Sequence, residues 1–231
     1  MSLGGDRLFG NDNALTGGVG YFRGKKVLLL GIDKGKNTND RILRNFGMAR
    51  PEGYRKAIRL MELANRFNLP VLSFIDTAGA YPGKGAEERG QAQAIASCID
   101  ACIKLNTPMI STILGEGGSG GAIALTSGNV ILMFEHSIFS VISPEGCASI
   151  LWRDASKANE AAKALKLTAN DMKKLNIIDE IIQEALGGAH RDYEKSLALL
   201  GDTIELQLNK LLKLDPQELK LIKQNKYLKI T

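Results

Sequence analysis

The segment that decides the fold is Leu114-Gly-Glu-Gly-Gly-Ser-Gly-Gly-Ala-Ile-Ala-Leu125, which follows the apolar run Pro108-Met-Ile-Ser-Thr-Ile-Leu114. The apolar run predicts a buried strand, and the small and apolar residues after the glycines predict a short buried helix. Five glycines around Glu116 and Ser119 leave backbone N–H groups uncovered by side chains at the expected start of that helix. These N–H groups lack intrahelical partners and lie at the positive end of the helix dipole. The segment therefore favours a bound phosphate or an oxyanion that develops during a reaction.

The spacing of the glycines leaves three interpretations open. Gly117–Gly121 matches the G-x-S-x-G nucleophile elbow of serine hydrolases, whose triad also needs a histidine after the serine. The sequence offers two, His136 and His190. Gly115–Gly120 matches the dinucleotide pattern G-x-G-x-x-G, with Glu135 near the expected acidic position. In the third interpretation the glycines only let a helix pack closely on a sheet.

Composition limits the class of protein. The 231 residues suffice for one sizeable domain with a full hydrophobic core, and no apolar run approaches the ~18–20 residues of a membrane span. No signal-peptide pattern opens the chain, and its three cysteines show no metal-binding spacing, which predicts reduced thiols in the cytoplasm. The formal charge of +5 comes from scattered lysines beside acidic residues, so we expect neither a nucleic acid nor a membrane as partner.

Strands and helices are expected to alternate along the chain. We predict strands at Lys25–Asp33, Leu69–Asp76, Pro108–Leu114, Val130–Phe134, Ser137–Ile142 and Ile177–Gln183, and helices from Pro51, over Ala86–Lys104 and over Ser143–Trp152. Lys34–Arg41 is expected to be a basic, polar loop that faces a ligand or partner. From Arg191 the pattern becomes helical and rich in Leu and Lys. The alternation predicts an α/β domain with its chemistry in loops at strand ends.

Several blocks occur in order along the chain: Arg44–Met48 (RNFGM), Pro51–Ala57 (PEGYRKA), Phe74–Gly83 (FIDTAGAYPG), Ala86–Gln91 (AEERGQ), Gly115–Ala122 (GEGGSGGA), Ser140–Trp152 (SVISPEGCASILW) and Leu186–Arg191 (LGGAHR). Together they resemble the alpha subunit of the carboxyltransferase component of multi-subunit, bacterial or plastid-type acetyl-CoA carboxylase. The resemblance covers nearly the whole chain from about Gly5.

The resemblance implies a crotonase-like (ClpP/crotonase) spiral of ββα units. We expect that domain over residues 4–190, followed by an appended helical extension over 191–231. The helical segment that precedes this point in the family is expected to be missing from the chain.

The resemblance also implies an activity and its partners. The family transfers the carboxyl group from carboxybiotin, held on a biotin carboxyl carrier protein, to acetyl-CoA and forms malonyl-CoA, the first committed step of fatty acid synthesis. The active site lies between the alpha subunit and a zinc-binding beta subunit in an alpha2–beta2 unit. A separate biotin carboxylase uses ATP to load the biotin. No metal is expected in this chain.

The family's oxyanion hole maps onto Gly120 and Gly121, whose N–H groups we expect to face the biotin oxygen. Gly117, Gly118 and Ser119 are expected to line the substrate site beside them. In this view the serine is a small residue at a helix start.

Tyr81, Pro82 and Gly83 have two open interpretations: they shape the biotin-side pocket, or they only terminate a strand. The Lys34–Arg41 loop is a candidate contact for the nucleotide part of CoA, whose phosphates favour cations.

Two alternatives to the transferase stay open. One is a serine hydrolase with Ser119 as nucleophile and His190 as base. The other is a non-catalytic, crotonase-like scaffold subunit. Ser119→Ala would abolish only the hydrolase, and Gly120→Val would leave a scaffold unaffected.

Overall fold

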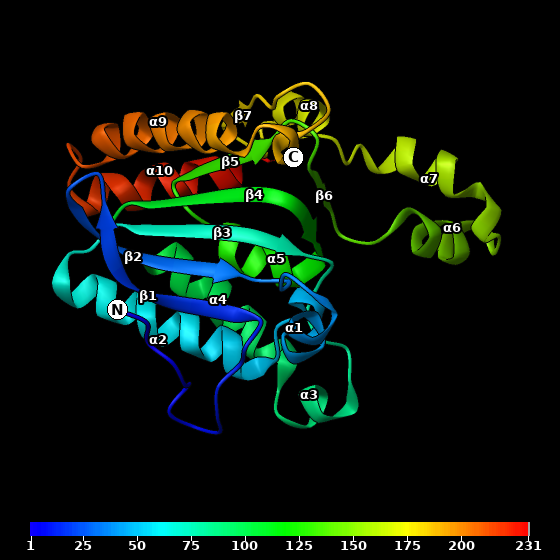
Figure 1. Cartoon of the computed structure of the whole chain (residues 1–231), viewed down its shortest axis with the longest axis horizontal. Helices are drawn as coiled ribbons and strands as arrows, with labels where there is room; N and C mark the ends of the chain where they lie inside the picture. The colour runs from blue at the N-terminus through cyan, green and yellow to red at the C-terminus, as the bar shows by residue number, and fades with distance from the viewer. Residues whose placement is uncertain (231) are drawn as a thin grey trace.

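The computed structural model describes residues 1–230 and contains one twisted sheet between helical layers (Figure 1). The strand order is β1-β2-β3-β4-β5-β7, and β6 pairs with the far end of β4. β1 and β2 are antiparallel, and every other pair is parallel. The parallel strands bring their carboxyl ends to one edge of the sheet.

The elements follow in chain order. The strands are β1 (Leu15–Phe22), β2 (Lys25–Ile32), β3 (Val71–Thr77), β4 (Met109–Gly118), β5 (Val130–Phe134), β6 (Ile138–Ser140) and β7 (Glu180–Ile182). The helices are α1 (Thr38–Leu43), α2 (Pro51–Phe67), α3 (Lys84–Glu88), α4 (Gln91–Lys104), α5 (Ser119–Thr126), α6 (Pro144–Trp152), α7 (Ala158–Leu165), α8 (Ala169–Lys174), α9 (Tyr193–Leu211) and α10 (Pro216–Leu228). Short 3-10 turns lie at Asn45–Gly47, Ala155–Lys157 and Ala189–Arg191.

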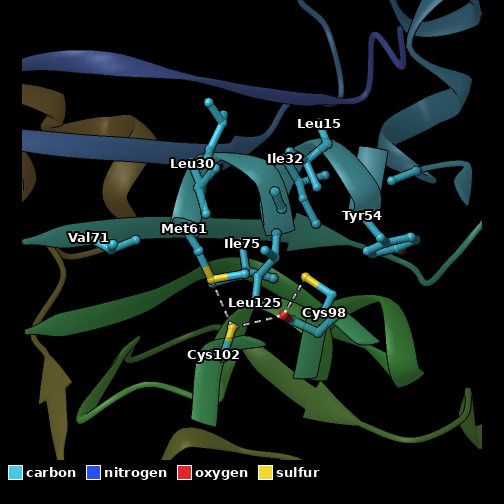
Figure 2. Close-up of a cluster of buried hydrophobic side chains, with 14 of the residues drawn as sticks. Leu15, Leu30, Ile32, Tyr54, Met61, Val71, Ile75, Cys98, Cys102 and Leu125 are labelled. Atoms are coloured by element: carbon cyan, nitrogen blue, oxygen red, sulfur yellow. Dashed lines mark hydrogen bonds between the residues drawn. The ribbon is translucent and has the colours of Figure 1, made fainter. Parts of the chain in front are cut away.

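Alternating side chains of the strands supply two hydrophobic layers. On one face, Leu28 and Ile75 pack with α2, α4 and α5 in a cluster that includes Met61 and two cysteines (Figure 2). On the other face, strand residues such as Leu72 pack against α9. The parallel strands are thus buried on both faces, as their nearly continuous apolar sequence requires.

The expected strands and helices are largely confirmed, with four corrections. The helix expected over Ala86–Lys104 is two helices, because Gly90 adopts a left-handed φ of 78° between them. The expected loop Lys34–Arg41 contains the start of α1, whose first turn is capped by the side chain of Asn37. The strands predicted over Ser137–Ile142 and Ile177–Gln183 are limited to the three residues of β6 and the three of β7.

The fourth correction concerns the glycine segment itself. β4 does not end at Leu114 but continues to Gly118, so the segment that looked like a loop is a strand. Gly117 pairs with Thr77 of β3 on one side and with Phe139 of β6 on the other. A Cβ on Gly118 would lie 2.2 Å from the carbonyl oxygen of Ala78, so only glycine fits there.

The helices after Arg191 lie against the sheet and do not project from it (Figure 1). Leu200, Ile204 and Leu208 of α9 share one hydrophobic cluster with strand residues. The boundary between residues 190 and 191 stays a prediction. By contrast, α6 and α7 extend away from the sheet (Figure 1). Among residues 1–230 no helix has both the length and the apolar character that a membrane crossing needs.

Candidate active site

The start of α5 lies where β4 leaves the sheet. Its N-cap residue, Gly118, offers no side chain to the N–H groups of the first turn. Ser119 follows with a left-handed φ of 54°, an unusual value for a residue with a side chain. Because the first-turn N–H groups of a helix have no intrahelical acceptor, the turn Ser119–Gly121 presents a positive field to whatever lies before it.

A cavity of about 500 Å³ opens in front of this turn. Gly120 and Gly121 form one wall, and Tyr81 and Pro82 form another. Ile95 and Val141 contribute apolar surface, and further lining comes from Ala78, Gly79, Ala80, Glu87, Gln91, Ala92, Ser119, Ile142 and Ser143. The structure therefore brings Tyr81 and Pro82 together with the glycine pair in the wall of one cavity.

Ala80, which no sequence motif singles out, contributes a backbone donor beside the glycine pair. A Cβ built on Gly121 would lie 2.7 Å from the Ala80 nitrogen, so the two residues are adjacent. The Ala80 N–H has no acceptor among residues 1–230, whereas the N–H groups on either side donate to Thr77 and Ala49. The available signal was topological, because loops after neighbouring parallel strands meet at one edge of the sheet.

The two glycines differ in what surrounds them. A Cβ on Gly120 would make an ordinary contact with Ile95, at 3.4 Å from its Cγ2. A Cβ on Gly121 would clash with the Gly79–Ala80 peptide and lie 3.0 Å from the hydroxyl of Tyr54. That hydroxyl is buried without a partner, and burial raises the pKa of Tyr54. Packing therefore requires a glycine at position 121, whereas a side chain at position 120 meets no steric obstacle in the fold.

A second cavity, of about 260 Å³, lies beside the glycine strand and shares Ala78 and Ser119 with the first. Gly117, Gly118 and Ser119 line it, together with residues of β6 and the start of α6. Ser143 caps α6 by accepting a hydrogen bond from the Gly146 N–H at 3.1 Å, as expected. Of the three candidate substrate-binding residues, Ser119 lines both cavities, and Gly117 and Gly118 line only the second.

Hydrogen bonds and a stacked guanidinium hold the cavity wall formed by Tyr81 and Pro82 in place. The Gln91 side-chain amide donates to the carbonyl oxygens of Tyr81 (2.9 Å) and Ala49 (3.0 Å), and the Tyr81 N–H donates to Ala49. The guanidinium of Arg50 lies over the Tyr81 ring, 4.7 Å from its centre. Gly83 does not line the cavity; a Cβ there would lie 2.3 Å from the Tyr81 ring, so this glycine lets the ring fold back.

Charged side chains gather where β2, β3 and β4 end. The Lys34 ammonium lies 2.8 Å from the carboxylate of Asp76 and also bonds to Glu116. Burial works to lower the pKa of Lys34, but the hydrogen bonds to the two carboxylates outweigh it and raise the pKa. Lys34 is thus a charged bridge between strand ends and not a candidate base.

The structure brings no histidine to Ser119. Neither of the two cavities that Ser119 lines has a histidine in its wall. His190 lies in the turn Ala189–Arg191 after β7, and the His136 N–H donates to Glu184. Among residues 1–230 no group of three or more His, Cys, Asp or Glu side chains is placed to hold a metal ion.

Solved structures of low sequence identity share this fold. The chain matches the hetero-dimer of Pseudomonas malonate decarboxylase with a TM-score of 0.74 and 14% identity, over 94% of this chain and 88% of that one. It matches the transcarboxylase 12S core with a TM-score of 0.67 and 18% identity, over 84% of this chain and 36% of the other. These likenesses confirm the expected crotonase-like fold.

Sequence relatives are much closer. The chain is 55% identical to the acetyl-coenzyme A carboxylase carboxyl transferase subunit alpha of Caulobacter vibrioides, over 98% of this chain and 71% of the relative. It is 58% identical to the protein of that name from Methylobacterium nodulans, over 99% of this chain and 72% of the relative. A family model described as acetyl co-enzyme A carboxylase carboxyltransferase-like matches residues 1–231. The chain therefore belongs to the family of carboxyltransferase alpha subunits of acetyl-coenzyme A carboxylase.

Proposed function

We propose that this chain is the alpha half of a carboxyltransferase that moves a carboxyl group from biotin on a carrier protein to acetyl-CoA, giving malonyl-CoA. Its active site is completed by a zinc-bearing beta subunit in an alpha2–beta2 unit, and a biotin carboxylase loads the biotin at the expense of ATP. The observation that carries the proposal is the set of three uncovered backbone donors, from Ala80, Gly120 and Gly121, in the wall of one cavity.

The cavity suits the ureido ring system of biotin. Its volume of about 500 Å³ and the apolar walls of Tyr81, Pro82 and Ile95 fit a small bicyclic group, while the backbone donors offer hydrogen bonds to a ureido oxygen. When bound, biotin supplies the carboxyl group and accepts the proton that acetyl-CoA loses.

This chain's own contribution is electrostatic. The N–H groups of Ala80, Gly120 and Gly121 stabilise negative charge on the oxygen they face, and they need no reorganisation because the strand end and helix start hold them in place. Removal of a single oxyanion-hole donor costs roughly 3–4 kcal/mol in enzymes where this has been measured. The proposal requires no side-chain base of this chain.

The test is the reverse reaction with malonyl-CoA and free biotin as substrates. The release of acetyl-CoA is the measured quantity. The chain, its beta partner and the mixture are measured separately, and we expect turnover only in the mixture. Gly120→Val should lower turnover at least ~100-fold while the thermal midpoint stays near that of the wild type, because branched methyl groups block the donors without a clash against backbone.

Ser119→Ala is the matched control. It should retain full transfer, since the proposal gives the hydroxyl no role. Loss of transfer with Ser119→Ala, or retained turnover in a folded Gly120→Val complex, would contradict the oxyanion assignment.

A further inference from the structure

The Gly79–Ala80 peptide carries the backbone donor that lies beside Gly121. It follows β3 in a stretch that is neither helix nor strand. Gly79 has a φ of 148°, which residues with a side chain rarely adopt, so local backbone preference does not fix this peptide. A donor that stabilises developing charge must nevertheless be held within about 0.5 Å of its productive position. Some other group therefore has to hold the peptide in place.

The side chain of Thr77 holds both ends of Gly79. Its hydroxyl accepts a hydrogen bond from the Gly79 N–H at 3.0 Å and lies 2.8 Å from the Gly79 carbonyl oxygen, to which it can donate. It also lies 2.8 Å from the carbonyl oxygen of Gly47, so its one proton is shared between two acceptors. Thr77 is fully buried, so water does not compete for these bonds.

The Gly79 carbonyl and the Ala80 N–H belong to one planar, trans peptide unit, in which they point in opposite directions. A hydroxyl that fixes the carbonyl therefore also fixes the direction of the N–H. A hydrogen bond to the carbonyl polarises the peptide as well, which makes its N–H a stronger donor in a low-dielectric site. Because the Ala80 N–H has no acceptor among residues 1–230, this donor is available to a bound ligand.

The same threonine is also connected to the glycine pair. Thr77 is the last residue of β3, and its backbone pairs with Gly117 of β4. One residue later, β4 ends and leads directly into the turn Ser119–Gly121. The side chain of Thr77 thus holds the segment with the Ala80 donor, and its backbone holds the strand that carries the glycine pair.

We propose that Thr77 is a positioning residue, whose hydroxyl orients and polarises the Ala80 N–H toward the charge that develops in the cavity. Thr77 itself lines neither cavity of the glycine segment, so it acts through the backbone donor. The inference rests on the proposed function for the reaction itself. It adds a buried side chain on which the strength of one donor depends.

The experiment measures transfer by the complete complex with the beta partner, using malonyl-CoA and free biotin. Thr77→Val replaces the hydroxyl by a methyl group and should lower kcat about tenfold to 100-fold, because it misplaces a donor whose removal costs roughly 100- to 1,000-fold. KM for both substrates should change less than about twofold, since the donor stabilises charge that is present only in the transition state. Thr77→Ser keeps the hydroxyl and should keep kcat within about threefold of the wild type.

Ser73→Ala is the matched control in the same strand. The Ser73 hydroxyl is also buried and lies 2.8 Å from the carbonyl oxygen of Leu125, but it lines neither cavity. This variant should lower the thermal midpoint, as Thr77→Val does, and leave kcat unchanged. Thr77→Ala removes the hydroxyl without placing a methyl group against the carbonyl oxygens of Gly47 and Gly79, so it should show the same loss of kcat if the valine variant does not fold.

A loss of kcat in Thr77→Val and Thr77→Ala that Thr77→Ser restores supports the positioning role. Wild-type kcat in a folded variant without the hydroxyl would overturn it. An equal loss in Thr77→Ser or in Ser73→Ala would do the same, because packing or general stability would then explain the effect. A rise in KM at unchanged kcat would also contradict the proposal.

Amide hydrogen exchange, followed residue by residue by NMR on the full chain, separates this inference from the proposed function. The Gly79 N–H should exchange at least ~tenfold faster in Thr77→Val than in the wild type, because it loses its acceptor, and the Ala80 amide resonance should shift. Unchanged Gly79 and Ala80 amides in this variant would reject the inference. A wild-type complex that transfers no carboxyl group, although these amides respond to Thr77→Val, would count against the proposed function and still support the hold of Thr77 on the donor.

Discussion

The two ends of helix α5 differ in whether their backbone groups have hydrogen-bond partners. At its N-terminus, Gly118 provides no side-chain cap and the first turn opens into the 500 Å³ cavity. At its C-terminus, the hydroxyl of Tyr227 donates to the carbonyl oxygens of Gly128 (2.9 Å) and, more weakly, Thr126 (3.4 Å). A side chain of helix α10 therefore supplies hydrogen bonds at the C-terminus of α5, away from the proposed reaction centre.

The neighbouring helix α4 ends in a similar way. Lys223 of α10 is fully buried, and its ammonium donates to the carbonyl oxygens of Leu105 (2.7 Å) and Cys102 (3.0 Å). A cation at a helix C-terminus also complements the helix dipole. Backbone groups are thus left unpaired where the proposed chemistry needs them and are hydrogen-bonded where they serve only stability.

The largest expected effect contrasts Gly121 with Gly120. Gly121→Val should abolish turnover and also lower the free energy of unfolding by about 1–3 kcal/mol, because the new side chain must displace the Gly79–Ala80 peptide. Urea denaturation of the two variants checks this. A Gly120→Val protein as unstable as Gly121→Val would show that both glycines serve packing.

At the C-terminus of α4, Lys223→Met should lower the free energy of unfolding by about 1–3 kcal/mol. The methionine fills similar space but leaves two buried carbonyl oxygens with fewer donors. Turnover of the folded complex should stay unchanged, since Lys223 lines neither cavity of the glycine segment. A Lys223→Met variant that lost turnover but kept wild-type stability would show that this helix end also serves the reaction.

The stability difference between wild type and Lys223→Met should depend on pH. Burial lowers the pKa of Lys223 to about 8 from its usual 10.5. Between these values the unfolded chain binds more protons than the folded one, so wild-type stability rises with pH relative to the variant. We expect a gain of about 1 kcal/mol from about pH 7 to pH 9, measured by urea denaturation at each pH. A constant difference would mean that the folded pKa is not lowered.

The smallest expected effect is that of Tyr227→Phe. Loss of its hydroxyl should lower the free energy of unfolding by about 0.5–1 kcal/mol, since one good hydrogen bond and one weak one disappear. Transfer activity should not change. A loss above about 3 kcal/mol would show that the hydroxyl does more than cap α5.

Much of this architecture could be predicted from local patterns. The strands through Val71–Thr77 and Val130–Phe134 and the capped helix at Pro144 follow from apolar runs and from Ser-Pro at a helix start. The break at Gly90 was missed because the sequence on both sides favours helix. The extension of β4 to Gly118 was missed because glycine is a poor strand former, and only pairing with β3 and β6 makes it a strand.

The sequence by itself determined the family and the alternation of strands and helices, because these depend on residue order and local spacing. The role of Gly120 and Gly121 stays a prediction from the family resemblance. Only the tertiary structure decided that Ala80 lies beside Gly121, that Gly121 is fixed by packing while Gly120 is not, and that Lys223 caps a helix 118 residues away in the chain. The physical reason is that these contacts join segments distant in sequence. Which backbone groups remain unpaired is settled only when the strands, helices and loops occupy their places in the fold.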